Sequence, residues 1–146
     1  MSDRSEAVDA WEALFRAQVA VLRDLSQEFP HGEISLNEYD VLFNLTRQPQ
    51  RRSRIRDLNK HLLLTQPSVS RLVDRLVSRG LVEKSADPGD ARGTVVALTD
   101  EGAELFRAVA MQHAASISRR VGGVLDPDEL RTLTSLTDKL RRGSPA

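Results

Sequence analysis

The chain has 146 residues, the length of one typical domain, and its 40% hydrophobic and 29% charged residues are typical of a folded protein rather than a disordered one. It has no cysteine, which excludes disulfides, zinc–thiolate sites, thiol nucleophiles and cysteine-based redox sensing. No apolar run is long enough to cross a bilayer, and the charged segment 1–9 is unlike a signal peptide, so we expect a cytoplasmic protein without membrane contact.

Apolar side chains near the N-terminus recur at spacings of three and four, which predicts a long amphipathic helix that ends near 30–32. They are Val8, Trp11, Phe15, Val19, Leu22, Leu25 and Phe29. Ser35 and Glu38 have the spacing of a capping box, which predicts a second helix that stops before Pro49. Its inward side chains are expected to be Tyr39, Leu42, Phe43 and Leu45.

Two short helices are predicted next. Ser53 is expected to cap the first of them, whose buried side would consist of Ile55, Leu58 and Leu62. Thr65 suits the N-cap of the second, and Pro67 is tolerated in its first turn. The apolar stripe of this fourth helix would consist of Val69, Leu72, Val73 and Leu76. Gly80 is placed to take the left-handed conformation that ends a helix.

Segments 81–84 and 94–98 are rich in β-branched residues and predict two strands, joined as a hairpin by the polar loop 87–93. Thr99 is expected to cap a fifth helix. Its inner face would consist of Phe106, Val109, His113, Ile117 and Val121. Asp126 and Pro127 start a sixth helix. Its inward residues would be Leu130, Leu133, Leu136 and Leu140.

Two short helices followed at once by a hairpin describe a winged helix-turn-helix, whose second helix presents its N-terminal side chains to base edges in the major groove. The net charge of zero argues against a nucleic-acid partner, but the distribution of charge reverses that argument. Segment 47–92 holds eleven basic and five acidic residues, a net charge of +6, and the rest of the chain holds −6. We therefore predict that the partner is double-stranded DNA.

The predicted DNA contacts are of three kinds. Those to base edges come from the fourth helix and are Thr65, Gln66, Pro67, Ser68, Ser70, Arg71 and Arg75. Arg92 in the hairpin is expected to enter the minor groove, with Asp90 holding its side chain. Arg54 and Lys84 would add contacts from the approach to the helices and from the hairpin. The alternative interpretation is a solvated helix face and a surface ion pair at the turn, which the sequential combination of features disfavours.

Segment 65–76, TQPSVSRLVDRL, is followed by Arg79-Gly80-Leu81-Val82 and later by the pattern Asp90-x-Arg92-x-x-x-Val96-x-Leu98-Thr99 with Gly102. Over 36–102 these motifs closely resemble the MarR-type regulators, and the rest of the chain is similar in helix order alone. The resemblance implies a mainly α fold with a small β-hairpin wing, in which the first, fifth and sixth helices intertwine in a homodimer that reads an inverted repeat.

The resemblance also divides the chain. It implies one MarR-like domain over 1–146, with a winged helix-turn-helix over 35–99 and a dimerisation part over 1–31 and 100–146. The expected function is transcription regulation, in most cases repression relieved by a small aromatic or lipophilic effector. Trp11, Phe15 and Tyr39 would line the effector pocket. The residues agree on a homodimer, because one winged unit offers two apolar terminal helices too little surface to pack on.

Other function classes find little support. There is no glycine-rich phosphate loop, nucleophile elbow or paired carboxylates, so we expect no catalytic residues and no enzyme. The three histidines lack metal-site spacing, and we expect neither metal nor cofactor; His113 fits a core or interface histidine. Two alternatives stay open, a winged-helix module that binds protein and a ligand-binding protein without a DNA role. No sequence feature favours either over the first.

Overall fold

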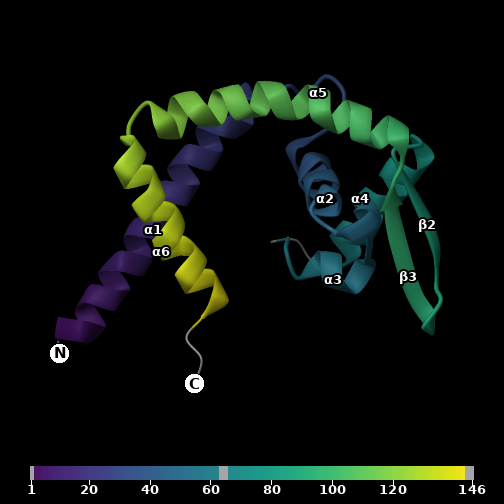
Figure 1. The fold of residues 1–146 in the computed structure, drawn as a ribbon, viewed down its shortest axis with the longest axis horizontal. Coiled ribbons are helices and arrows are strands. Elements are labelled where there is room, and N and C mark those ends of the chain that lie inside the picture. The colour runs from purple at the N-terminus through teal and green to yellow at the C-terminus, as the bar shows by residue number, and fades with distance from the viewer. Residues whose placement is uncertain (1, 63–65, 144–146) are drawn as a thin grey trace. The chain divides into compact units, whose positions relative to one another are not determined.

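The computed structural model describes residues 2–62 and 66–143, which are mostly helical with one small sheet (Figure 1). In chain order the elements are α1 (Ser2–Glu28), α2 (Leu36–Thr46), the turn η1 (Pro49–Arg51), β1 (Arg52–Arg54), α3 (Ile55–Asn59), α4 (Gln66–Ser78), β2 (Val82–Asp87), β3 (Asp90–Leu98), α5 (Asp100–Ile117), the π-helical turn η2 (Ser118–Gly122) and α6 (Pro127–Arg142). The chain divides into a helical unit, within Met1–Phe29 and His113–Ala146, and a winged unit, Pro30–Gln112. The predicted mainly α fold with a hairpin wing is confirmed.

Local capping defines the helices of the winged unit. The Ser35 hydroxyl accepts from the Glu38 amide at 3.1 Å, and the Glu38 carboxylate accepts from the Ser35 amide at 2.9 Å, which is the predicted capping box of α2. Gly80 ends α4 with φ of +74°, the left-handed conformation expected there. The core of this unit includes the predicted apolar stripe of α4, which is buried: Val69, Leu72, Val73 and Leu76.

The sheet differs from the prediction in two ways. It has three antiparallel strands in the order β1-β3-β2, and the third strand, β1, was expected to be part of a helix start. Ser53 does not cap α3: Arg54 occupies the N-cap position, and the Ser53 hydroxyl instead donates to the Arg54 carbonyl at 3.0 Å. The hairpin is also longer than predicted, because β2 runs to Asp87 and β3 starts at Asp90, leaving a two-residue turn.

The helical unit contains α1, the end of α5, η2 and α6. As predicted, α6 begins at Pro127, directly after Asp126. Asp126 and Glu129 also form a second capping box, which was not predicted. The expectation that the apolar stripe of α6 faces inward is wrong within one chain, and most of the apolar stripe of α1 is uncovered there as well. Their larger apolar side chains are exposed: Val8, Trp11, Phe15, Val19, Leu22, Leu133, Leu136 and Leu140.

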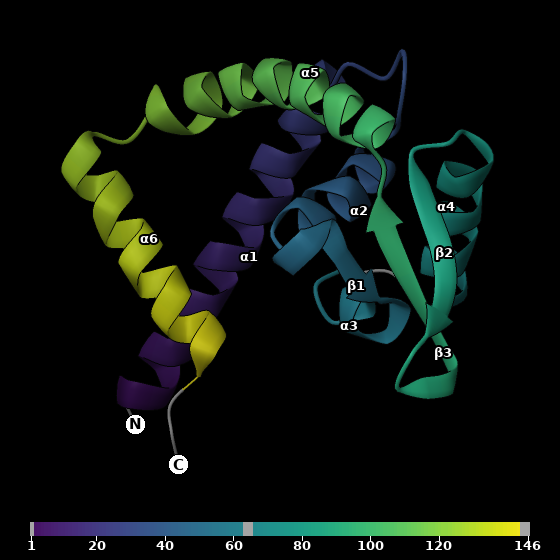
Figure 2. The same cartoon turned by 45° about the vertical axis from the view of Figure 1, so that its right-hand side comes forward.

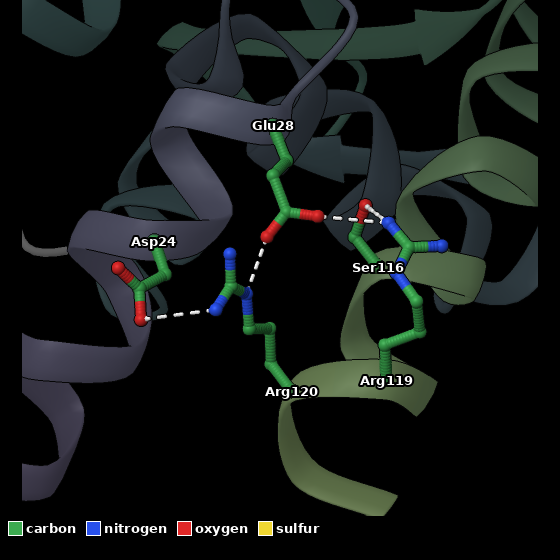
Figure 3. Close-up of polar contacts among 5 residues, drawn as sticks. All are labelled: Asp24, Glu28, Ser116, Arg119 and Arg120. Carbon is green, nitrogen blue, oxygen red and sulfur yellow. Dashed lines mark hydrogen bonds and ion pairs between the residues drawn. The ribbon is translucent and has the colours of Figure 1, made fainter. Parts of the chain in front are cut away.

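A cluster of charged groups joins α1 to the end of α5 and to η2 (Figure 3). Arg119 Nη2 donates to Glu28 Oε2 at 2.8 Å, and Arg120 Nε donates to the other oxygen of the same carboxylate. Arg120 also pairs with Asp24, at 3.7 Å, and the Ser116 hydroxyl accepts from Arg119 at 3.4 Å. Hydrogen bonds from Arg119 and Arg120 lower the pKa of the Glu28 carboxyl below its usual range.

We expect Glu28→Gln to lower the melting temperature at neutral pH. Because the pKa of Glu28 is lowered in the folded state, its stabilising effect is present above the unfolded-state pKa and is lost as the pH falls through the folded-state pKa. The wild-type and variant melting temperatures should therefore converge in acid. Glu12→Gln is the control, since Glu12 forms an exposed pair with Arg16 at 3.8 Å, and such pairs contribute little to stability. An equal deficit at neutral and acid pH would mean that the carboxylate charge has no part in the effect.

Candidate nucleic-acid interface

The solvent face of α4 carries the charges expected of a DNA-reading helix. Arg71, Asp74, Arg75 and Ser78 follow one another at helical spacings and are exposed, opposite the buried stripe. Ser68 and Ser70 are partly buried, and Arg71 Nη2 donates to the Ser68 hydroxyl at 3.3 Å. Thr65 lies outside the described residues, as do the side chains of Gln66 and Pro67, the first residues of α4.

Lys84 on β2 is paired with an acid of α4. Its Nζ lies 2.7 Å from Asp74 Oδ1, so the pair ties the recognition-helix candidate to the wing. Both side chains are substantially exposed, and such pairs contribute little to stability. Sequence reasoning proposed Lys84 as a DNA contact without foreseeing this partner, which neutralises its charge locally.

Arg92 is exposed on β3, two residues after that strand begins. Asp90 Oδ1 accepts from the backbone amide of Arg92 at 3.0 Å. Asp90 was expected to hold the Arg92 guanidinium, but its carboxylate instead accepts a hydrogen bond from the Arg92 main chain. An acid two residues before an amide is well placed for such a local turn, which competes with side-chain pairing.

Asp87 was not predicted as a site residue; the sequence shows it only as one of the five acids of segment 47–92. Its carboxylate is buried, and Oδ2 lies 2.6 Å from Nε of Arg54, which is 33 residues earlier in the chain. The Arg54 side chain stays 41% exposed. Arg54, a predicted DNA contact, is thus paired through Nε while part of its side chain remains accessible to solvent.

Elements of the winged unit converge on a polar cleft. Figure 2 shows β1 and α3 on one side of β3, and α4 beside β2. The cleft has a volume of about 290 Å³ and is lined by Arg54, Ile55, Arg56, Ser70, Asp90, Arg92, Gly93 and Thr94. Three guanidinium groups against one carboxylate suit a phosphate-bearing ligand, because guanidinium groups match phosphate oxygens in geometry and charge.

The residues predicted to line an effector pocket lie in both units. Trp11 and Phe15 are exposed on α1, with ring centroids 6.1 Å apart. Tyr39 on α2 is buried in the winged unit, where it stacks on Phe106 at 5.1 Å. Burial raises the pKa of the Tyr39 hydroxyl. A role for the three in ligand binding stays a prediction.

Residues 2–62 and 66–143 offer neither a metal-binding cluster nor a membrane-spanning helix. These residues hold no group of three or more histidine, aspartate or glutamate side chains that could bind a metal. His113 is buried and meets the Phe29 ring edge-on at 5.3 Å, and burial lowers the pKa of its imidazole, as befits a packed histidine. Among the described helices, none combines the length and apolarity that a membrane span requires.

Known proteins match the chain in sequence and in fold. The MarR family profile matches residues 33–93. An uncharacterised HTH-type transcriptional regulator of Bacillus subtilis, YkoM, is 30% identical over 145 residues, which cover 95% of this chain and 91% of the relative. The crystal structure of Sco3205 from Streptomyces coelicolor, a MarR family transcriptional regulator in complex with DNA, superposes with a TM-score of 0.79 at 27% identity. That match covers 97% of this chain and 90% of Sco3205.

Two further solved structures are similar. A mutant of Escherichia coli MarR, complexed with operator DNA, has a TM-score of 0.74 at 25% identity and covers 92% of this chain and 95% of that one. Bordetella bronchiseptica BpsR, whose DNA binding is regulated by 6-hydroxynicotinic acid, has a TM-score of 0.76 at 26% identity, with coverages of 91% and 93%. The fold and the basic face thus define a winged helix-turn-helix transcriptional regulator. The chain belongs to the MarR family.

Proposed function

We propose that this regulator binds an inverted-repeat operator as a homodimer and represses a promoter until a small aromatic or lipophilic effector weakens the complex. The observation that carries the proposal is the convergence of Arg54, Arg56 and Arg92 on one cleft, which α4 also lines through Ser70. Phosphate contacts from the cleft would set affinity, and α4 side chains in the major groove would set sequence preference. The DNA complexes of Sco3205 and E. coli MarR support this role.

The two units would divide the work. Segment 35–99 would bind DNA, and segments 1–31 and 100–146 would dimerise, within one MarR-like domain. Support comes from the exposed apolar side chains of α1 and α6, because a stable monomer seldom leaves so many large apolar groups in water. Two-fold pairing would bury them and place two wings on half-sites about one helical turn, ~10 bp, apart.

Effector control is the third part of the proposal. BpsR responds to 6-hydroxynicotinic acid, a small aromatic acid, which supports the same class of ligand here. We assign contact with such an effector to three aromatic side chains, Trp11, Phe15 and Tyr39. The test is a thermal-shift screen of small aromatic acids, followed by DNA-binding assays with each hit. A ligand that stabilises the protein and leaves DNA affinity unchanged would contradict control by that ligand.

The DNA proposal is tested by letting the full chain select duplexes from a random library. We expect one inverted repeat, which should also appear in a footprint on the DNA flanking the chain's own gene. Affinity for the selected duplex should fall steeply with salt, because each neutralised phosphate releases counterions. Weak binding with no selected sequence and a shallow salt dependence would instead favour a winged-helix module that binds protein.

Arg71→Ala should weaken binding to the selected duplex by about 1–3 kcal/mol if Arg71 reads a guanine, and should change binding to random duplex little. Its exposed position on α4 supports direct readout. The measurement is a titration of both duplexes at one salt concentration. Arg107→Ala, at an exposed position of α5, is the matched control. Equal losses on both duplexes would assign Arg71 to a phosphate.

A further inference from the structure

Asp87 is a buried carboxylate in an otherwise exposed hairpin end. Only 6% of the residue is accessible, whereas the residues on both sides of it, Ala86 and Pro88, are exposed. A negative charge is costly to bury and is unfavourable beside a polyanion. Its place in the DNA-facing wing therefore calls for a function that outweighs both effects.

The partners of Asp87 bind both of its oxygens. Oδ2 meets Arg54 Nε at 2.6 Å, and Oδ1 accepts from the Gly89 amide at 2.9 Å, which closes the two-residue turn. Gly93 makes the necessary room: a Cβ there would lie 3.0 Å from the Asp87 Cβ and 3.2 Å from Oδ2. The carboxylate is therefore fixed by charge, by the turn and by close packing.

The sheet order turns this ion pair into a clamp. Arg54 is on β1 and Asp87 on β2, which are the two edge strands, and β3 lies between them. Arg54 is also the N-cap residue of α3, the first helix of the helix-turn-helix. The pair therefore links the outer end of the wing to the start of the helical pair, across the strand that carries Arg92.

We propose that Asp87 is the positioning residue of the wing. It pairs with Nε of Arg54, whose side chain lines the same cleft as Arg92. Held in this way, the hairpin presents Arg92 to the DNA in one orientation, so less conformational freedom is lost on binding. The proposal rests on the DNA-binding function proposed above and adds a residue that need not touch DNA.

The test is Asp87→Asn in the full chain, measured on the duplex that the wild type selects. Asparagine keeps the acceptor for the Gly89 amide and removes the charge that holds Arg54. We expect affinity to fall about 10-fold, and the further effect of Arg92→Ala to shrink from about 10-fold to less than about 3-fold, because coupled residues are not additive. The effect of Arg71→Ala should keep its full size in the same background.

Asp57→Asn is the matched control, because it removes the same charge from a side chain of α3 whose ion pair, within the described part of the chain, is with Lys60 at 3.2 Å. We expect it to leave affinity unchanged or to raise it. Arg54→Lys is the second variant: it keeps both charges but loses the planar guanidinium, and should reproduce the coupling to Arg92. The proposal is overturned if Asp87→Asn behaves like Asp57→Asn, if Arg92→Ala keeps its full effect, or if Arg54→Lys binds like the wild type.

A readout without DNA separates this proposal from the function it rests on. Amide hydrogen exchange in β2 and β3 should be faster in Asp87→Asn than in Asp57→Asn, because the clamp that resists local opening is gone. Unchanged exchange would overturn the clamp even if the protein binds DNA. Failure of the wild type to select any duplex would overturn the DNA function, and the exchange result would still decide whether Asp87 holds the wing.

Discussion

A chain with aspartate in place of Leu136 is expected to be monomeric and to lose tight operator binding. Leu136 lies on α6 and is 59% exposed in the single chain, on the same stripe as Leu133 and Leu140. If that stripe packs against a second copy, the variant buries an unpaired carboxylate, a change that interfaces tolerate poorly. Operator affinity should then fall by about 100-fold or more, because two half-sites are no longer held by one molecule.

Light scattering on a sizing column checks the first half of this expectation. The wild type should have the mass of two 16.2 kDa chains and the variant the mass of one. Ser135→Asp is the matched control, since residue 135 is the exposed neighbour on the opposite face of α6. A Leu136→Asp variant that remains dimeric and binds the selected duplex normally would remove α6 from the interface.

Much of the fold could be predicted because its rules are local. Both capping boxes, at Ser35 and at Asp126, need only four consecutive residues, and Gly80 ends α4 by its own conformational freedom. The apolar residues of α4 recur at spacings of three and four, so the helical period can be seen within the helix's own sequence. Each of these features depends on residues that lie within one or two helical turns of one another, so the sequence alone specifies them.

Strand β1 was missed because its signals are weak and its partner is distant. It has three polar residues, Arg52–Arg54, and pairs with Val95–Ala97 at the far end of the winged segment. The turn before it uses Gln50 and Arg51 with φ of 59° and 56°, a conformation usually left to glycine or asparagine. Pro49 marks the end of α2 but not the start of the strand, and Ser53 offered a plausible helix cap instead.

The candidate site was predicted as a set of residue types but not as a set of contacts. Positions in the predicted helices and hairpin pointed to Arg54, Lys84 and Arg92, whereas their partners follow from register and sheet order. Lys84 meets Asp74 across the α4–β2 contact, and Arg54 meets Asp87 across β3. Tertiary geometry therefore decides which arginine is held by protein and which is free for a phosphate.

Gly102 belongs to the motif that resembles the MarR-type regulators, and the structure explains why this position holds a glycine. A Cβ at this position would lie 2.1 Å from the Leu81 carbonyl oxygen and 2.8 Å from Leu98 Cδ1. That carbonyl cannot easily retreat, because it accepts from the Thr99 amide at 3.1 Å. Thr99 in turn accepts from the Gly102 amide at 3.0 Å and donates to the Gly80 carbonyl at 2.7 Å. Any side chain at 102 therefore pushes against the junction of α4, the hairpin and α5.

We accordingly expect Gly102→Ala to lower the free energy of unfolding by about 2–4 kcal/mol, at or above the upper end of the usual cost of overpacking, even though alanine favours helix. Chemical denaturation of both proteins measures the difference. Gly32→Ala is the control: nothing lies within 4 Å of a Cβ there, so the change should stay within about 0.5 kcal/mol. Equal stability of Gly102→Ala and the wild type would mean that α5 starts farther from the Leu81 carbonyl than a 2.1 Å contact requires. The close packing of α5 on the start of the hairpin would then be contradicted.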